Sequence, residues 1–192
     1  DIIELEEHFS NYGDWMKREL EIGFRERMLG YIESKGKNSQ LISRIEEDFN
    51  IHLPVQRDFQ VIKDSDDGSF LWLGRGYPYR WLIFHHTENL DGLNPKTAWG
   101  RLKVTLEATI GNIQILEDYR LSDMFAVRDQ YFPVIRGVYG HKESQSGGPF
   151  FTVIVENKKE ETILISGFVN YPGHDKLMLL KQLETAVSAA EF

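Results

Sequence analysis

The sequence predicts an α+β fold: a mainly antiparallel sheet in a two-layer sandwich, with helices on one face, preceded by a long amino-terminal helix. Apolar residues recur every three or four positions near both ends and in the middle of the chain, and between these stretches short β-rich runs alternate with turn-forming residues. The short connections between the runs favour antiparallel pairing. We expect residues 1–50 to form a helical segment that packs on or extends from an α+β domain of residues 51–192, the two making one structural unit.

The first helix is predicted by a stripe of apolar residues at helical spacing. The stripe consists of Leu5, Phe9, Tyr12, Met16, Leu20 and Phe24. The helix should reach about Ser34, because Gly36 is a typical helix stop. Aromatic residues lie on more than one of its sides (Trp15, Tyr31), so the helix needs a neighbour, either the sheet or a partner.

A second, shorter helix follows, with Asn38 or Ser39 as its amino-terminal cap. Residues 46–48 are acidic and should face solvent. The apolar face is formed by Leu41, Ile42, Ile45 and Phe49.

Three strands are predicted next, over Val55–Lys63, Ser69–Gly74 and Arg80–His86, separated by turns at 64–68 and 75–78. In the third run both the odd and the even positions are apolar. Both faces of this strand should therefore be covered, and it should lie centrally in the sheet. A helix should then start at Asn94-Pro95, as a cap followed by a first-turn proline, and reach Gly111. It should bury Trp99, Leu102, Leu106 and Ile110.

The carboxy-terminal half begins with residues 116–130, which show no clear periodicity. Tyr131–Tyr139 predicts a strand that Pro133 assigns to a sheet edge. Phe150–Glu156 and Glu161–Val169 predict a hairpin. A last helix, capped by Asp175, should bury Leu177, Leu180, Leu183 and Val187.

The glycine pair Gly147-Gly148 has the composition of a phosphate loop, but a phosphate loop precedes a helix and this pair precedes a strand. We interpret it as the entry to the strand, where glycine supplies backbone angles that other residues avoid.

Composition narrows the function classes. The formal charge of −8 disfavours binding to nucleic acid. The absence of cysteine excludes disulfides and thiolate chemistry. No apolar run is long enough for a membrane span, and the first residues do not resemble a signal peptide.

The candidate catalytic residues are His86 and Glu88, which a strand would place on the same face, with His85 on the other. The pair has the chemistry of a base with its orienting carboxylate, or of two metal ligands with His52 as a third. We favour the simpler interpretation that polar residues end the strand in solvent, and we predict no metal and no cofactor.

Candidate ligand-binding residues are Arg128, Arg136 and Tyr79. The arginines, with Asp129, suit an anionic ligand, although local salt bridges are the interpretation we favour. Five aromatic residues suit either of two arrangements. In one they line a groove that binds a sugar or peptide; in the other the tryptophans belong to the core and the tyrosines lie at its rim. They are Trp72, Tyr77, Tyr79, Trp81 and Trp99.

Short motifs follow one another along the chain and together resemble a known family. They are Phe70-Leu71-Trp72-Leu73, Arg128-Asp129, Arg136-Gly137, Gly147-Gly148-Pro149-Phe150, Gly167-Phe168-Val169, Tyr171-Pro172-Gly173, Lys176 and Leu183-Glu184. In this order they resemble the domain of unknown function forty-eight thirty-seven, a family of predicted lipoproteins from the Bacteroidota and related bacteria. The resemblance extends from Asn38 to the end of the chain and is densest from Arg136 onward.

The resemblance implies a place in the cell envelope, periplasmic or anchored to the outer membrane. Family members are longer at the amino terminus and carry a lipidated cysteine after a signal peptide, so we expect this chain to be a carboxy-terminal fragment or mature form with a lipid anchor upstream. The connection between Arg128-Asp129 and Arg136-Gly137 is shorter here than in the family.

We expect a non-enzymatic binding or assembly module whose partner is a protein or an envelope polymer. The acidic charge, the lack of a catalytic motif and the aromatic first helix favour this interpretation. The alternative is a hydrolase or metal-dependent enzyme with its site near His86 and Glu88. Convergence of these two residues with His52 or Arg136 in one pocket would favour the enzyme.

Overall fold

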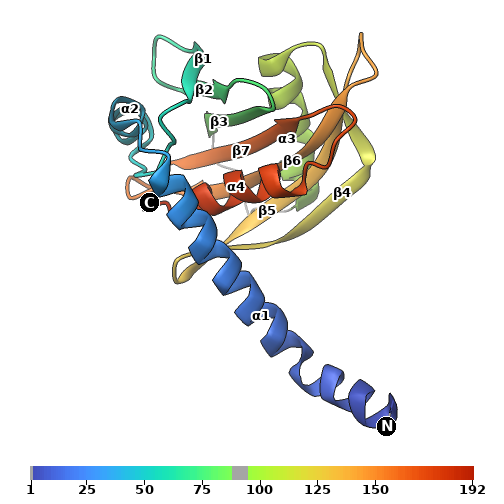
Figure 1. Cartoon of the computed structure of the whole chain (residues 1–192). Helices are drawn as coiled ribbons and strands as arrows, with labels where there is room; N and C mark the ends of the chain where they lie inside the picture. Colours follow the sequence, from blue (N-terminus) through green and yellow to red (C-terminus); the bar gives the residue numbers. More distant parts are fainter. Residues whose placement is uncertain (1, 88–94) are drawn as a thin grey trace.

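The computed structural model describes residues 2–87 and 95–192 (Figure 1). The helices and strands alternate along the chain as the sequence predicts, with one additional strand. In chain order, they are α1 (Ile2–Ser34), α2 (Ser39–Phe49), β1 (Gln60–Asp64), β2 (Phe70–Arg75), β3 (Tyr79–Thr87), α3 (Pro95–Ile110), β4 (Ile113–Val127), β5 (Gln130–His141), β6 (Gly147–Glu156), β7 (Thr162–Asn170) and α4 (Leu177–Ser188).

The strands form one seven-stranded sheet in the order β1-β2-β3-β7-β6-β5-β4. Every neighbouring pair in this sheet is antiparallel, which confirms the predicted α+β class. The prediction that β3 lies centrally is also confirmed, because it pairs with β2 on one side and with β7 over nine residues on the other. The β3–β7 pairing therefore joins the first half of the sheet to the second.

Helices cover both faces of the sheet, so the prediction that they lie on one face is wrong. One core contains the apolar sides of α2 and α4 together with Leu82 and Phe84 of β3. The other contains Trp99 and Leu106 of α3 together with Ile83 of β3. Figure 1 shows α3 on the side of the sheet opposite to α4. Alternate residues of a strand point to opposite faces, so the doubly apolar strands serve two cores.

Helix α1 packs on the body only near its carboxy-terminal end. Phe24, Met28 and Ile32 contact Ala186 of α4 in a small apolar cluster. The rest of α1 extends away from the sheet and the other helices (Figure 1). The neighbour of its last turns is thus α4 and not the sheet as predicted, and within residues 2–87 and 95–192 no other element accompanies the first turns.

The predicted helix boundaries agree with the cap geometry. Gly36 has a φ of +78°, in the region that glycine tolerates, and ends α1. The Asn38 side chain accepts a hydrogen bond from the backbone N–H of Leu41, which confirms it as the cap of α2. Asp175 accepts a hydrogen bond from the N–H of Leu177 at 3.0 Å, but the residue at the cap position of α4 is Lys176, so the predicted cap is wrong by one residue.

The predictions at the starts of α3 and α4 have different outcomes. Leu177 was expected in the core, but it lies at the start of α4 and is 57% exposed. Asn94, the predicted cap of α3, lies outside the described residues; α3 begins at Pro95.

The least regular part of the sequence forms β4, a strand of 15 residues at the edge of the sheet. The edge assignment for Tyr131–Tyr139 is therefore wrong, because β5 lies between β4 and β6. Pro133 is accommodated near the end of the β5–β6 pairing: it is opposite Met124 of β4, whereas the register with β6 starts at Val134.

Gly147 and Gly148 start β6, as predicted, but for a different physical reason. Neither has a positive φ. Instead, a Cβ atom at either position would overlap a main-chain carbonyl oxygen of a neighbouring strand, that of Tyr139 for Gly147 and that of Val169 for Gly148. Close approach of backbones requires glycine at this point of the sheet.

Candidate functional site

One exposed apolar surface lies on the amino-terminal half of α1. Trp15, Met16 and Leu20, which we call the α1 stripe, are 54%, 41% and 67% exposed. Met16 and Leu20 continue at four-residue intervals into Phe24 and Met28, which pack against α4. The stripe is thus an extension of the α1–α4 contact, left uncovered where α4 ends.

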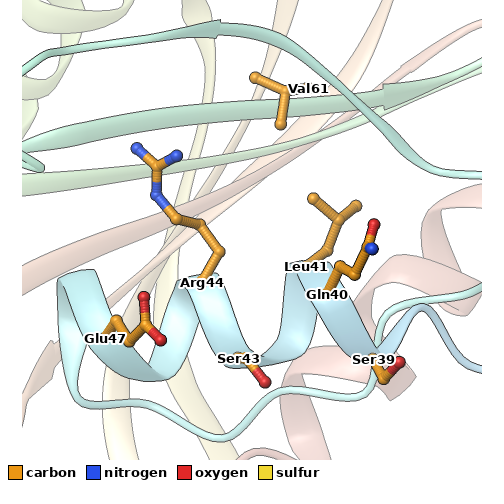
Figure 2. A pocket seen from close by; sticks show the side chains of 7 residues that line it. All are labelled: Ser39, Gln40, Leu41, Ser43, Arg44, Glu47 and Val61. Carbon is orange, nitrogen blue, oxygen red and sulfur yellow. The ribbon is translucent and has the colours of Figure 1, made fainter.

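A wide, shallow hollow lies between α2 and β1, with a volume of about 490 Å³ (Figure 2). Leu41 and Arg44 extend from α2 toward Val61 of β1, whereas Ser43 points away. Arg44 forms salt bridges with Asp48 and with Asp64, the latter at 3.2 Å, and the hydrogen bond with Asp48 is the main cause of its raised pKa. The cation at this hollow therefore already has carboxylate partners.

The two adjacent histidines of β3 serve different faces of the sheet. The His86 ring stacks on Phe49 at 4.9 Å, and its Nε2 lies 2.9 Å from the main-chain carbonyl oxygen of Asp48. His85 is buried on the other face with its Nε2 2.9 Å from the Thr109 hydroxyl, and burial lowers its pKa to about 4. Glu88, the predicted companion of His86, lies outside the described residues.

His52, the suggested third ligand, has a partner of its own. Its Nδ1 pairs with a carboxylate oxygen of Glu46 on the surface, and its backbone bridges to Glu191. In residues 2–87 and 95–192 no group of three or more histidine or carboxylate side chains is arranged to hold a metal ion. A catalytic role for His86 with Glu88 stays a prediction.

The two candidate arginines form ion pairs with different carboxylates. Arg128, at the β4–β5 turn, pairs with Glu191 near the carboxy terminus. Arg136 of β5 lies 2.9 Å from Glu184 of α4, whose other oxygen accepts from Lys181 at 2.6 Å. The Glu184 side chain is 6% exposed, so this triad fixes α4 on the sheet. Anion binding by either arginine stays a prediction.

The candidate aromatic groove separates into a surface part and an inner part. Tyr77 and Tyr79 are 60% and 45% exposed and meet edge to face, with ring centroids 5.6 Å apart. Tyr77 also contacts Tyr171, which stacks on His174 at 4.3 Å. Tyr171 and His174 were not among the predicted site residues, because they lie about ninety residues further along the chain than the two tyrosines, and the motif Tyr171-Pro172-Gly173 indicated only the family.

The tryptophans lie inside or at the margin of the second core. Trp99 is buried against Phe150, and Trp72 and Trp81 meet edge to face at 5.4 Å while half-buried. This arrangement agrees with the interpretation of tryptophans as core and tyrosines as rim.

Among the helices of the described chain, none has the length and apolar character that a membrane crossing requires.

Solved structures of other proteins are similar to this chain, and each of the three described next covers 73% of it. A point mutant of protein Mog1 aligns with a TM-score of 0.47 at 12% identity over 89% of that chain. LpqN, described as involved in cell envelope biogenesis of Mycobacterium tuberculosis, aligns with a TM-score of 0.40 at 14% identity over 81% of its chain. A protein from Bacteroides thetaiotaomicron aligns with a TM-score of 0.30 at 10% identity over 44% of its chain.

No curated protein matches the chain. One family model does, over residues 106–189, which run from the end of α3 through the last four strands to α4. The matched residues include the segment after Arg136 in which the family motifs are densest. The carboxy-terminal part of this chain thus matches the domain of unknown function DUF4837, which confirms the resemblance predicted from its motifs.

Proposed function

We propose that this chain is a non-enzymatic binding or assembly module of a cell-envelope lipoprotein, and that it holds a partner protein through the α1 stripe. The envelope location is supported by what the family resemblance implies. The observation that carries the binding role is the exposure of Trp15, Met16 and Leu20 on a helix that extends away from the body.

The chemistry of the stripe favours a helical, apolar partner. The same face of α1 binds α4 through Phe24, Met28 and Ile32, so a second helix can continue that contact beyond α4. Trp and Met are enriched at protein interfaces because they offer large contact areas, and Met adapts to the partner's shape.

The charge of α1 argues against an anionic lipid surface as the occupant. The helix contains eight acidic residues (4, 6, 7, 14, 19, 21, 26 and 33) and four basic ones (17, 18, 25 and 27). Amphipathic helices that lie on membranes have a basic polar face, and the excess of carboxylates here is repelled by anionic headgroups.

The proposal is tested by site-specific photo-crosslinking in the native bacterium, using the full-length precursor with a crosslinking amino acid at Trp15. The matched control carries it at Met178, an exposed apolar residue of α4. We expect a discrete protein adduct from position 15 only. The protein identified is then purified, and we expect Leu20→Ser to weaken its binding at least tenfold while Met178→Ser leaves it unchanged.

Equal adducts from both positions, adducts with lipid alone, or equal affinities of the two serine variants would overturn the proposal. Leu20 is 67% exposed, so its replacement should not affect folding, and a lost interaction can be attributed to the stripe.

A further inference from the structure

A small cavity lies where the last turn of α1 meets the body. It has a volume of about 10 Å³, which is room for a single water-sized occupant. Its walls come from four parts of the chain: Ile32 of α1, Gln56 of the segment before β1, Arg80 of β3, and Gln182 of α4. Gln56 and Arg80 are 5% and 4% exposed.

Arg80 is a buried cation without a carboxylate. Its Nη1 donates to the side-chain oxygen of Gln182, its Nε has no acceptor, and no salt bridge within the described part of the chain involves it. Burial is the main reason that the pKa of Arg80 is lowered to about 10. A buried guanidinium ordinarily has a charged partner, because its desolvation is costly.

Gln56 adds a second donor without an acceptor. Its side-chain oxygen accepts from Arg75 Nη1 at 2.9 Å, which fixes the orientation of the amide and leaves Nε2 unpartnered. Arg75 pairs with Asp58, and its own Nε also lacks an acceptor. Two arginines and one carboxylate leave one positive charge in this region, and two of the nitrogens without an acceptor, Arg80 Nε and Gln56 Nε2, belong to residues that line the cavity.

We propose that the cavity binds one small inorganic anion of the halide class, with chloride as the natural occupant. A chloride ion is only slightly larger than a water molecule, accepts several N–H donors at once and neutralises the charge of Arg80. Water has a similar size, but it needs acceptors for its own hydrogens and supplies no charge.

The anion would have a structural consequence for α1. Ile32 is 2% exposed and lines the cavity together with Ala186, the residue of α4 on which α1 packs. An occupant held by Arg80 and Gln56 therefore fixes the base of the projecting helix to β3 and α4.

Diffraction from crystals of the wild-type chain grown in bromide tests the occupant directly. We expect an anomalous peak within hydrogen-bonding distance of Arg80 and Gln56. Density for water alone, without an anomalous peak, would overturn the proposal.

Thermal unfolding tests it in solution. We expect the wild type to melt about 2–4 °C higher in sodium chloride than in sodium gluconate at equal ionic strength. Gln182→Glu places a carboxylate beside Arg80 and should abolish this difference. Gln145→Glu, which makes the same charge change at an exposed site, should retain it.

Three results of the unfolding experiment contradict the proposal. They are equal melting in the two salts for the wild type, a retained chloride effect in Gln182→Glu, and loss of the chloride effect in Gln145→Glu. If Gln182→Glu does not fold, Gln56→Glu replaces it with the same expectation, because that change removes a donor and adds the missing charge.

Discussion

Replacing Gly148 with alanine should destabilise the sheet through a clash that side-chain rotation cannot relieve. The added Cβ would overlap the carbonyl oxygen of Val169, on β7, well inside the 3.0 Å limit that Cβ contacts respect. Overpacking of this kind costs about 2 kcal/mol when the backbone has to move. The same oxygen accepts a hydrogen bond from the buried Tyr139 hydroxyl at 3.1 Å, whose loss adds roughly 1 kcal/mol.

We therefore expect the free energy of unfolding, measured by urea titration with unchanged m-value, to fall by about 3 kcal/mol. In a Tyr139→Phe background the cost of Gly148→Ala should fall to about 2 kcal/mol, because the hydrogen bond is already absent.

Gly140→Ala is the matched control, since Gly140 lies opposite Gly147 in the same sheet and its Cβ would meet nothing within 4 Å. Its effect should stay within about 0.5 kcal/mol. If Gly148→Ala and Gly140→Ala destabilise the protein equally, close backbone approach is not the reason for the glycine.

Three further changes test the packing of the helices and the buried histidine. Because burial lowers the pKa of His85 to about 4 from 6.5, the unfolded state binds the extra proton between these values, so stability falls as pH drops from 6.5 toward 4. His85→Gln should remove roughly 2 kcal/mol of that fall in urea titrations at pH 7 and pH 4.5, and an unchanged pH slope would refute the assignment. Glu184→Gln should cost about 2 kcal/mol, because two cations lose their carboxylate, whereas Glu191→Gln on the surface should cost about 0.5 kcal/mol or less. Met28→Ala should cost roughly 2 kcal/mol by denaturant titration and Leu20→Ala almost nothing; equal costs would mean that α1 does not pack as described.

Elements with a strong periodic pattern could be predicted from the sequence. The α2 helix combines a capping side chain, Asn38, with apolar residues on one face, so local chemistry alone determines its bounds. The doubly apolar run of β3 likewise predicted a central strand. The same periodicity does not say which face of a sheet a helix covers, because both faces of β3 are apolar, and this is why the sequence did not predict helices on both faces.

The strand β4 could not be predicted because its middle has no buried side. Residues 117–124 are all exposed, and the pairing with β5 is irregular between Leu116 and Leu121. An edge strand needs neither an apolar face nor a regular alternation, so its sequence resembles a loop.

The candidate sites were harder to predict than the fold. Charged residues such as Arg128 were visible as candidates, but the carboxylate that binds this one lies 63 residues away at Glu191. The cavity at Arg80 is formed by residues from four segments, none of which has a recognisable motif. Long-range contacts of this kind follow from topology, which single-sequence patterns do not specify.

The strand order has a consequence for the segment that matches the family model. Residues 106–189 contain β7 but not β3, its partner over nine residue pairs. Expressed alone, this segment would present β7 as an open edge whose side chains from Ile163 to Asn170 are all buried in the whole chain. Such an edge recruits other strands, so we expect the isolated segment to aggregate or exchange strands between copies.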